Sequence, residues 1–176
     1  SGLPAFRPLF DALSRMGFYN LNPDRIRDLQ QPDSGELLTR DGGNLASVLA
    51  QMATHHEHSK QRIEEYLSKI VPGVHGVDRQ MIGKRETIEF RQSVAGQEKP
   101  LRFQASNMSD GTLRALGVLV ALLQNTNGTG YQTQLVGIEE PEAALHPAAA
   151  GVLIDSLREA SRMRQVIVTS HSPDLI

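Results

Sequence analysis

The chain has 176 residues, of which 39% are hydrophobic and 22% charged, so it can bury one core and we expect one domain or part of one. Its formal net charge of -2 argues against a strongly basic nucleic-acid-binding surface. The absence of cysteine excludes disulfides and thiolate metal sites, and the longest apolar run, 115–123, is too short to span a bilayer. We therefore expect a cytoplasmic protein that does not contact the membrane.

Residues 1–80 are expected to be mainly helical. Apolar residues at spacings of three and four predict an amphipathic helix over 5–17, and 18–21 then has the composition of a short strand. The same spacing predicts two further helices, over 45–52 and 60–70. These helices would form the N-terminal region of the fold.

Two short stretches resemble ligand-binding motifs without meeting their requirements. His55 and His58 are three positions apart and could share a helix face as zinc ligands, but a solvated polar junction explains them as well, and no fourth ligand is evident. A phosphate-binding loop of the form G-x-x-x-x-G-K-[ST] ending at Lys84 would need glycine in place of Asp78 and a hydroxyl in place of Arg85. That loop is therefore absent from the 176 residues.

Residues 81–176 carry the clearer signals. Alternating apolar and polar residues predict a hairpin between 86–94 and 100–105. Ser109 or Asp110 can cap the helix that follows, and 113–123 is apolar nearly all round, which predicts a fully buried helix. Gly111 leaves the first turn of that helix without a side chain that would obstruct a phosphate.

A βαβ unit is predicted in the last third of the chain. The apolar run 135–138 is predicted to be a strand buried on both faces, and 147–162 a helix. A second β-branched run, within 165–172, is predicted to be another strand that ends in His171. Glu139 and Glu140 close the first strand. Because parallel strands end at one edge of their sheet, we expect the two acids to meet Ser170 and His171 there.

The paired glutamates permit two readings. Neighbouring residues on a strand point to opposite sides, so Glu139 could face a metal ion while Glu140 faces a water, which suits nucleotide hydrolysis. Consecutive glutamates before a helix are also common simply because negative charge complements the helix dipole. The residues around them decide between the two.

Four short motifs follow one another in the second half of the chain. They are Ser109-Asp110-Gly111-Thr112-Leu113-Arg114, Ile138-Glu139-Glu140-Pro141-Glu142, Leu145-His146-Pro147 and Thr169-Ser170-His171-Ser172-Pro173. In this order they resemble the signature loop, Walker B, the D-loop and the switch histidine of ABC-type ATPase heads, specifically the branch of AAA-type ATPases related to RecF and SMC proteins. Two earlier stretches also look like landmarks of that family, Tyr19-Asn20-Leu21 with Pro23 and Asp41-Gly42-Gly43-Asn44-Leu45-Ala46.

The resemblance implies a fold and a set of roles. The fold would be α/β, the C-terminal part of a P-loop NTPase of the ABC-head type, with parallel core strands, a β-hairpin and an N-terminal helical region. Glu139 would hold Mg²⁺, Glu140 would deprotonate the attacking water, and His171 would contact the γ-phosphate. The remaining nucleotide-binding residues would be Ser109, Asp110, Gly111, Ser170 and His146.

The resemblance also implies partners. ATP would lie between two heads of a homodimer, so Ser109 and Gly111 would reach the partner's nucleotide and stand apart from Glu140 within one chain. DNA is a further possible partner. Two positions depart from the common ABC pattern, because Glu139 replaces an aspartate and His146 stands at the place of the D-loop aspartate.

The missing phosphate-binding loop, Walker A, leaves alternatives open. In the family that loop lies nearer the N-terminus, so we expect the chain to be the C-terminal portion of a longer ATPase and to be inactive alone. There are two alternatives, a non-catalytic interaction module that keeps the fold and a transporter-type ABC ATPase. A transporter ATPase would show a substrate-gated helical insertion and a more standard signature loop, neither of which is evident.

Overall fold

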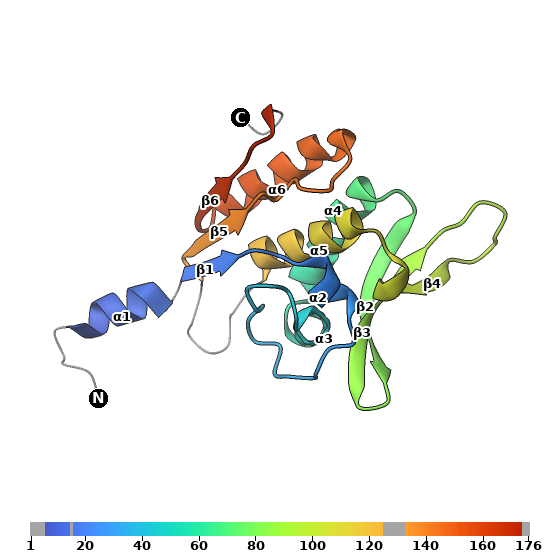
Figure 1. The fold of residues 1–176 in the computed structure, drawn as a ribbon, viewed down its shortest axis with the longest axis horizontal. Helices are drawn as coiled ribbons and strands as arrows, with labels where there is room; N and C mark the ends of the chain where they lie inside the picture. The colour runs from blue at the N-terminus through green and yellow to red at the C-terminus, as the bar shows by residue number, and fades with distance from the viewer. Residues whose placement is uncertain (1–5, 15, 125–132, 174–176) are drawn as a thin grey trace.

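The computed structural model describes residues 6–14, 16–124 and 133–173. One of its two sheets, sheet A, is parallel and consists of β1 (Met16–Tyr19), β5 (Leu135–Glu139) and β6 (Gln165–Thr169) in the order β1-β5-β6 (Figure 1). All three strands run in the same direction, so their carboxyl ends lie at one edge of the sheet.

The predicted βαβ unit is confirmed. β5 is followed by a short 3₁₀ helix, η3 (Pro147–Ala149), then by α6 (Ala150–Ser161) and β6, which pairs with β5 in parallel. The central strand β5 is buried from Val136 to Ile138, as its continuous apolar run predicts.

The first strand lies two residues earlier than expected. β1 covers Met16–Tyr19 instead of 18–21, and Gly17 lies within it. A β-carbon at Gly137 of β5 would lie 2.4 Å from the ring of Phe18, so the glycine makes room for an aromatic side chain on the paired strand. β1 thereby becomes the third strand of sheet A.

A second sheet, sheet B, is an antiparallel meander of β2 (Val74–Ile82), β3 (Arg85–Gln92) and β4 (Leu101–Gln104). The expected hairpin is the β3–β4 pair, in which Phe90 lies opposite Phe103. Sequence analysis assigned no strand to β2, and the boundary placed at residue 80 lies inside it.

The core lies between the two sheets and is filled by helices. α5 (Asp110–Leu123) is buried from Leu113 to Leu123 except at Arg114, which confirms the predicted buried helix. α3 (Leu45–His55) and α4 (Glu57–Ile70) contact it, and both also contact β2. Two shorter helices, α2 (Pro23–Arg27) and η2 (Ala105–Asn107), complete this region.

The first helix, α1 (Arg7–Ser14), is present as predicted but its apolar face is not covered within the described residues. No residue of α1 is buried, and Leu9, Phe10 and Leu13 are each more than half exposed. Figure 1 shows α1 extending away from the rest of the molecule. Amphipathic spacing therefore identified the helix, but not a partner for its apolar face.

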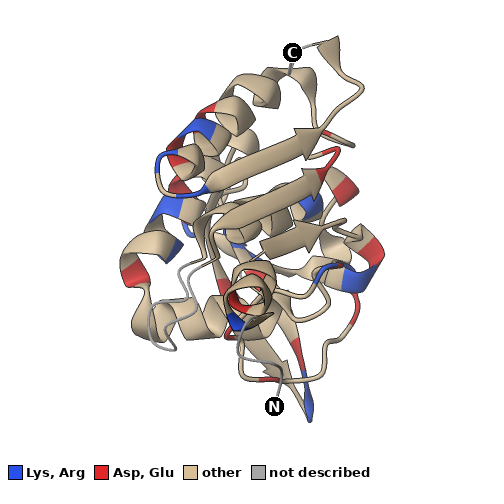
Figure 2. Ribbon diagram, turned by 90° about the vertical axis from the view of Figure 1, so that its left-hand side faces the viewer, with Lys and Arg blue, Asp and Glu red and all other residues tan. Residues whose placement is uncertain are grey.

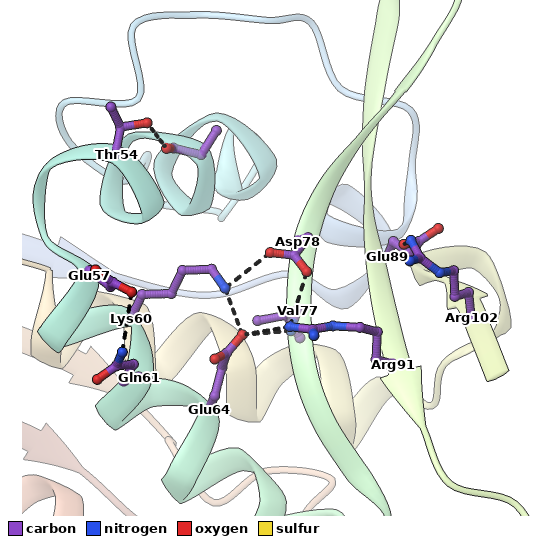
Figure 3. A network of polar contacts seen from close by, with 11 residues as sticks. Thr54, Glu57, Lys60, Gln61, Glu64, Val77, Asp78, Glu89, Arg91 and Arg102 are labelled. Carbon is purple, nitrogen blue, oxygen red and sulfur yellow. Dashed lines mark hydrogen bonds and ion pairs between the residues drawn. The ribbon is translucent and has the colours of Figure 1, made fainter. Parts of the chain in front are cut away.

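A network of charged side chains ties α4 to sheet B (Figure 3). Lys60, whose side chain is 9% exposed, lies 2.6 Å from Glu64 and 3.1 Å from Asp78. Arg91 of β3 contacts the same two carboxylates, and Glu64 also accepts a hydrogen bond from the backbone N–H of Val77. Two cations thus face two anions, which offsets the free-energy cost of burying Lys60.

Candidate functional site

The candidate site lies at the carboxyl edge of sheet A. Glu139, the last residue of β5, lies opposite Thr169, the last residue of β6. The backbone N–H of Glu140 donates a hydrogen bond of 2.9 Å to the carbonyl of Thr169, so the two chains stay together beyond the strands. Figure 2 shows the three strands side by side, with acidic residues at the end of the central one. The predicted meeting of the two acids with Ser170 and His171 is confirmed.

Glu140 and His171 face each other across this edge. Nε2 of His171 lies 3.6 Å from Oε1 of Glu140, and the two side chains are 93% and 50% exposed. A carboxylate and an imidazole at this separation, both open to solvent, can contact one substrate between them. The pair is therefore the best-placed acid–base couple at the sheet edge.

The sequence predicts that Glu139 and Glu140 point to opposite sides because neighbouring strand residues alternate. The structure shows a different cause for the orientation of Glu140. β5 ends at Glu139, and Glu140 has a φ of 43°, in the left-handed region that non-glycine residues seldom adopt. The turn after the strand, not the pleat of the strand, therefore sets the direction of Glu140 relative to Glu139.

Glu139 is held on both carboxylate oxygens by residues far away in the sequence. Nδ2 of Asn20 donates a hydrogen bond of 2.8 Å to Oε2, and Nη2 of Arg40 lies 3.3 Å from Oε1. Sequence analysis did not assign either residue to the site. Asn20 lies in the landmark Tyr19-Asn20-Leu21 and Arg40 directly precedes Asp41-Gly42-Gly43-Asn44, so both landmarks were usable signals.

A second polar contact links the turn after β5 to the loop after β6. The hydroxyl of Ser170 donates a hydrogen bond of 2.5 Å to Oε1 of Glu142, and it accepts one of 3.0 Å from the backbone N–H of Ser172. Oε2 of Glu142 is buried and has no hydrogen-bond partner in the part of the chain that the structure describes. Ser170 thus makes a contact within the chain that fixes the turn carrying His171.

Ser109 and Asp110, which the sequence predicts to belong to a signature loop, are exposed at the start of α5. Ser109 caps this helix by accepting a hydrogen bond of 3.2 Å from the backbone N–H of Thr112, as predicted. Asp110 accepts a hydrogen bond from Arg27, and that bond raises the pKa of the Arg27 guanidinium above its usual value. Ser109 and Asp110 remain accessible from outside the chain.

Gly111 has a different neighbour from the one that the sequence suggested. It is buried, and a β-carbon there would lie 2.2 Å from the carbonyl oxygen of Ala144 in the same chain. The missing side chain therefore makes room for the backbone that follows β5. The start of α5 thus contacts Ala144, which lies four residues after Glu140.

His146 is exposed and caps η3. Its Nδ1 accepts a hydrogen bond of 3.2 Å from the backbone N–H of Ala148. Neither Glu140 nor Glu139 is among its hydrogen-bond partners in the described part of the chain. Its predicted nucleotide contact stays a prediction.

The carboxylates fit Mg²⁺ better than a metal with a full set of protein ligands. Within residues 6–14, 16–124 and 133–173, no group of three or more His, Asp or Glu side chains could hold a metal ion, and His55 and His58 form none. Mg²⁺ commonly keeps several waters and binds through one or two carboxylates plus substrate phosphates. The half-exposed side chains of Glu139 and Glu140 meet this requirement.

A cavity of about 930 Å³ lies beside the loop that carries Arg40, lined by Arg25, Asp41, Asn44 and Arg85 among others, but neither Glu139 nor His171 borders it. Of the helices that the structure describes, none combines the length and the apolar character needed to cross a bilayer.

Three solved structures of SMC proteins are similar to the chain. The Smc head with an extended coiled coil bound to the C-terminal domain of ScpA, from Pyrococcus furiosus, has a TM-score of 0.49 and 16% identity over 68% of this chain and 29% of that one. The SmcHead bound to the C-winged helix domain of ScpA has a TM-score of 0.50 and 16% identity over 68% and 36%. A structure concerned with ATP-driven dimerization and DNA-stimulated activation of SMC ATPases has a TM-score of 0.48 and 19% identity over 71% and 73%.

These likenesses concern the fold. The chain spans about a third of the length of the first two structures. The match to the SmcHead agrees with the α/β arrangement and the parallel sheet A, so the fold is that of a P-loop ATPase head.

Sequence comparison supplies the family. A search of curated proteins finds no match. The family described as "AAA domain, putative AbiEii toxin, Type IV TA system" matches residues 3–176. Because this match covers nearly the whole chain, and the fold is that of an ABC- and SMC-like ATPase head, the chain belongs to this family of AAA-type ATPase domains.

Proposed function

We propose that the chain is part of an ATP-hydrolysing head that works as a dimer with ATP and Mg²⁺. The observation that carries this proposal is the approach of His171 to Glu140, 3.6 Å apart at the carboxyl edge of a parallel sheet. In α/β sheets this edge is where ligands bind. The two residues lie on neighbouring strand ends, so one phosphate group can be reached by both.

Each acidic residue takes one role in the proposed reaction. Glu140 accepts a proton from the attacking water, since its carboxylate is half exposed and beside His171. Glu139 holds Mg²⁺, which when bound neutralises charge on the phosphates. His171 donates a hydrogen bond to the terminal phosphate, and the contact between Ser170 and Glu142 keeps the histidine turn in place.

The proposed site is composite. Ser109 and Asp110 are exposed at the N-terminus of α5, where backbone N–H groups and the helix dipole favour a phosphate. A second head could place its nucleotide there. Gly111 would act indirectly, because its close contact with Ala144 positions the start of α5 against the Walker B segment.

The test is the variant Glu140→Gln in a form of the protein that includes a phosphate-binding loop. We expect steady-state turnover to fall by about 10² to 10⁴-fold, because a general base is lost, while ATP binding measured by calorimetry stays unchanged. Gel filtration should then show an ATP-bound dimer. Turnover within about threefold of the unmodified protein would exclude Glu140 as the base.

A second candidate function is a non-catalytic interaction module. The observation that favours it is the absence of G-x-x-x-x-G-K-[ST] from the 176 residues. Without that loop most of the ground-state binding of the phosphates is missing. Failure of every form of the protein to hydrolyse ATP, with Glu140 present, would favour the module.

A further inference from the structure

Two residues outside the four ATPase motifs, Asn20 and Arg40, bind the carboxylate that we assign to the metal. Asn20 follows β1 and Arg40 lies in the loop before α3, 119 and 99 positions away from Glu139 in sequence. Each takes a different oxygen, Asn20 at 2.8 Å on Oε2 and Arg40 at 3.3 Å on Oε1. Both oxygens of Glu139 therefore already have a partner from the same chain.

The loop that carries Arg40 is firmly placed. The backbone N–H of Asn20 donates a hydrogen bond of 3.0 Å to the carbonyl of Arg40, and that of Asn22 donates one of 3.1 Å to the carbonyl of Asp41. Asp41 in turn accepts hydrogen bonds from Arg25, Thr39 and the N–H of Gly43. Asn20 and Arg40 are thus neighbours through backbone contacts, and they approach Glu139 together.

The chemistry of the two partners differs. An amide is neutral and can remain on one oxygen while a metal ion binds the other. A guanidinium is a permanent cation, so a divalent cation on the same oxygen would be repelled by it. The Arg40 side chain is 69% exposed, which leaves it free to swing away.

We propose that Arg40 is the resident counter-ion of Glu139, which leaves Oε1 when a divalent cation binds, whereas Asn20 stays on Oε2 and positions the carboxylate. This proposal rests on the proposed role of Glu139 as the metal acid. In the metal-free state Arg40 offsets the repulsion between the adjacent carboxylates of Glu139 and Glu140. The loop before α3 is thereby connected to the occupancy of the metal site.

The test uses Mn²⁺ alone, without ATP, on the chain as printed. Paramagnetic broadening of the backbone amide signals of Glu139 and Glu140 in NMR spectra reports where the ion binds. Glu139→Gln should abolish the broadening. If it does not, Glu139 is not the metal acid, and the proposed function loses its metal role independently of Arg40.

The two partners of Glu139 should then act in opposite directions. Arg40→Gln removes a repelling charge and should lower the Mn²⁺ concentration for half-maximal broadening about fivefold. Arg40→Lys keeps the charge and should stay near the unmodified protein. Asn20→Ala removes a hydrogen bond that orients the carboxylate and should raise that concentration roughly threefold. This effect is smaller than is typical for residues that orient a metal ligand, because Asn20 is exposed.

A matched control is Arg102→Gln. The Arg102 side chain is also 69% exposed and is also paired with a glutamate, Glu89, but in sheet B. It should leave the broadening unchanged. Weaker Mn²⁺ binding in Arg40→Gln, or equal binding in Arg40→Lys and Arg40→Gln, would overturn the proposal, because the arginine would then have a structural role only.

Discussion

Gly111 at the start of the signature helix lies so close to Ala144 that a β-carbon at 111 would be 2.2 Å from the Ala144 carbonyl oxygen. Gly111→Ala therefore has to displace backbone, and we expect it to destabilise the fold by about 2 kcal/mol in urea unfolding. Gly151→Ala is the control, since nothing lies within 4 Å of a β-carbon there. Because Gly151 is helical, that change should stabilise by about 0.5 to 1 kcal/mol. Equal effects of the two would show that Gly111 is not tightly packed.

The hydrogen bond from Ser170 to Glu142 should couple the two loops of the site. In a double-mutant cycle with Ser170→Ala and Glu142→Gln, we expect a coupling energy of about 1 kcal/mol, because the acceptor is charged and partly buried. Ser161→Ala, which removes an exposed hydrogen bond to the carbonyl of Arg158, should change stability by less than about 0.5 kcal/mol. Additive effects of the first two variants would mean that the loops are independent.

Removing one partner from the charged network around Lys60 should destabilise the fold. Lys60→Met leaves Glu64 partly buried without its closest cation, and we expect a loss of about 2 kcal/mol in urea unfolding. Adding Glu64→Gln should recover part of this loss, because the amide oxygen still accepts the hydrogen bond of Val77, position 64 carries no charge, and Arg91 still pairs with Asp78.

Arg158→Met is the matched surface control for this network. It breaks an exposed pair with Asp155 at 3.8 Å and should cost less than about 0.5 kcal/mol. If Lys60→Met is equally mild, solvent reaches the network freely.

Tyr19 should make stability fall at alkaline pH. Burial raises the pKa of Tyr19 from 10.0 to about 12, against the opposing effect of the hydrogen bond from Gln124. The unfolded chain therefore loses this proton first, so the contribution is complete below pH 10 and is lost as the pH rises through about 12. The difference between the two pKa values corresponds to about 3 kcal/mol in the free energy of unfolding.

Tyr19→Phe tests this directly in urea unfolding at several pH values. At neutral pH the variant should be less stable by about 1 kcal/mol, because Gln124 loses its hydrogen-bond partner. The two stability curves should cross at about pH 11. The stability of the variant should still decline somewhat at alkaline pH, because Tyr66 remains. Burial and the Glu159 carboxylate also raise the pKa of Tyr66 to about 12. Parallel curves would mean that Tyr19 is ionised equally in both states.

The parts of the fold that sequence analysis identified carry local signals. An apolar run, a helical spacing and a second apolar run predict β5, α6 and β6 regardless of the rest of the chain. The buried helix α5 is likewise apparent, because both of its faces are apolar from Leu113 to Leu123. Parallel pairing then places Glu139 and His171 at one edge without further information.

The parts that were missed depend on contacts distant in sequence. β2 carries Asp78, Arg79 and Gln80 in succession, and its charged residue Asp78 is matched by Lys60 of α4 and Arg91 of β3. The contacts of Asn20 and Arg40 with Glu139 likewise join separate elements. No spacing within the sequence encodes such pairs, because each partner lies in its own locally ordinary segment.

At position 140 the residue that would be most stable differs from the residue that provides a carboxylate, because the backbone there is left-handed. A non-glycine residue with a φ of 43° costs about 1 kcal/mol, and glycine would relieve that strain. A laboratory evolution that rewards only thermal tolerance should therefore favour glycine or asparagine at this position and lose the acid. Glu140 should persist only where the screen also rewards ATP hydrolysis, the activity in which we propose that it acts.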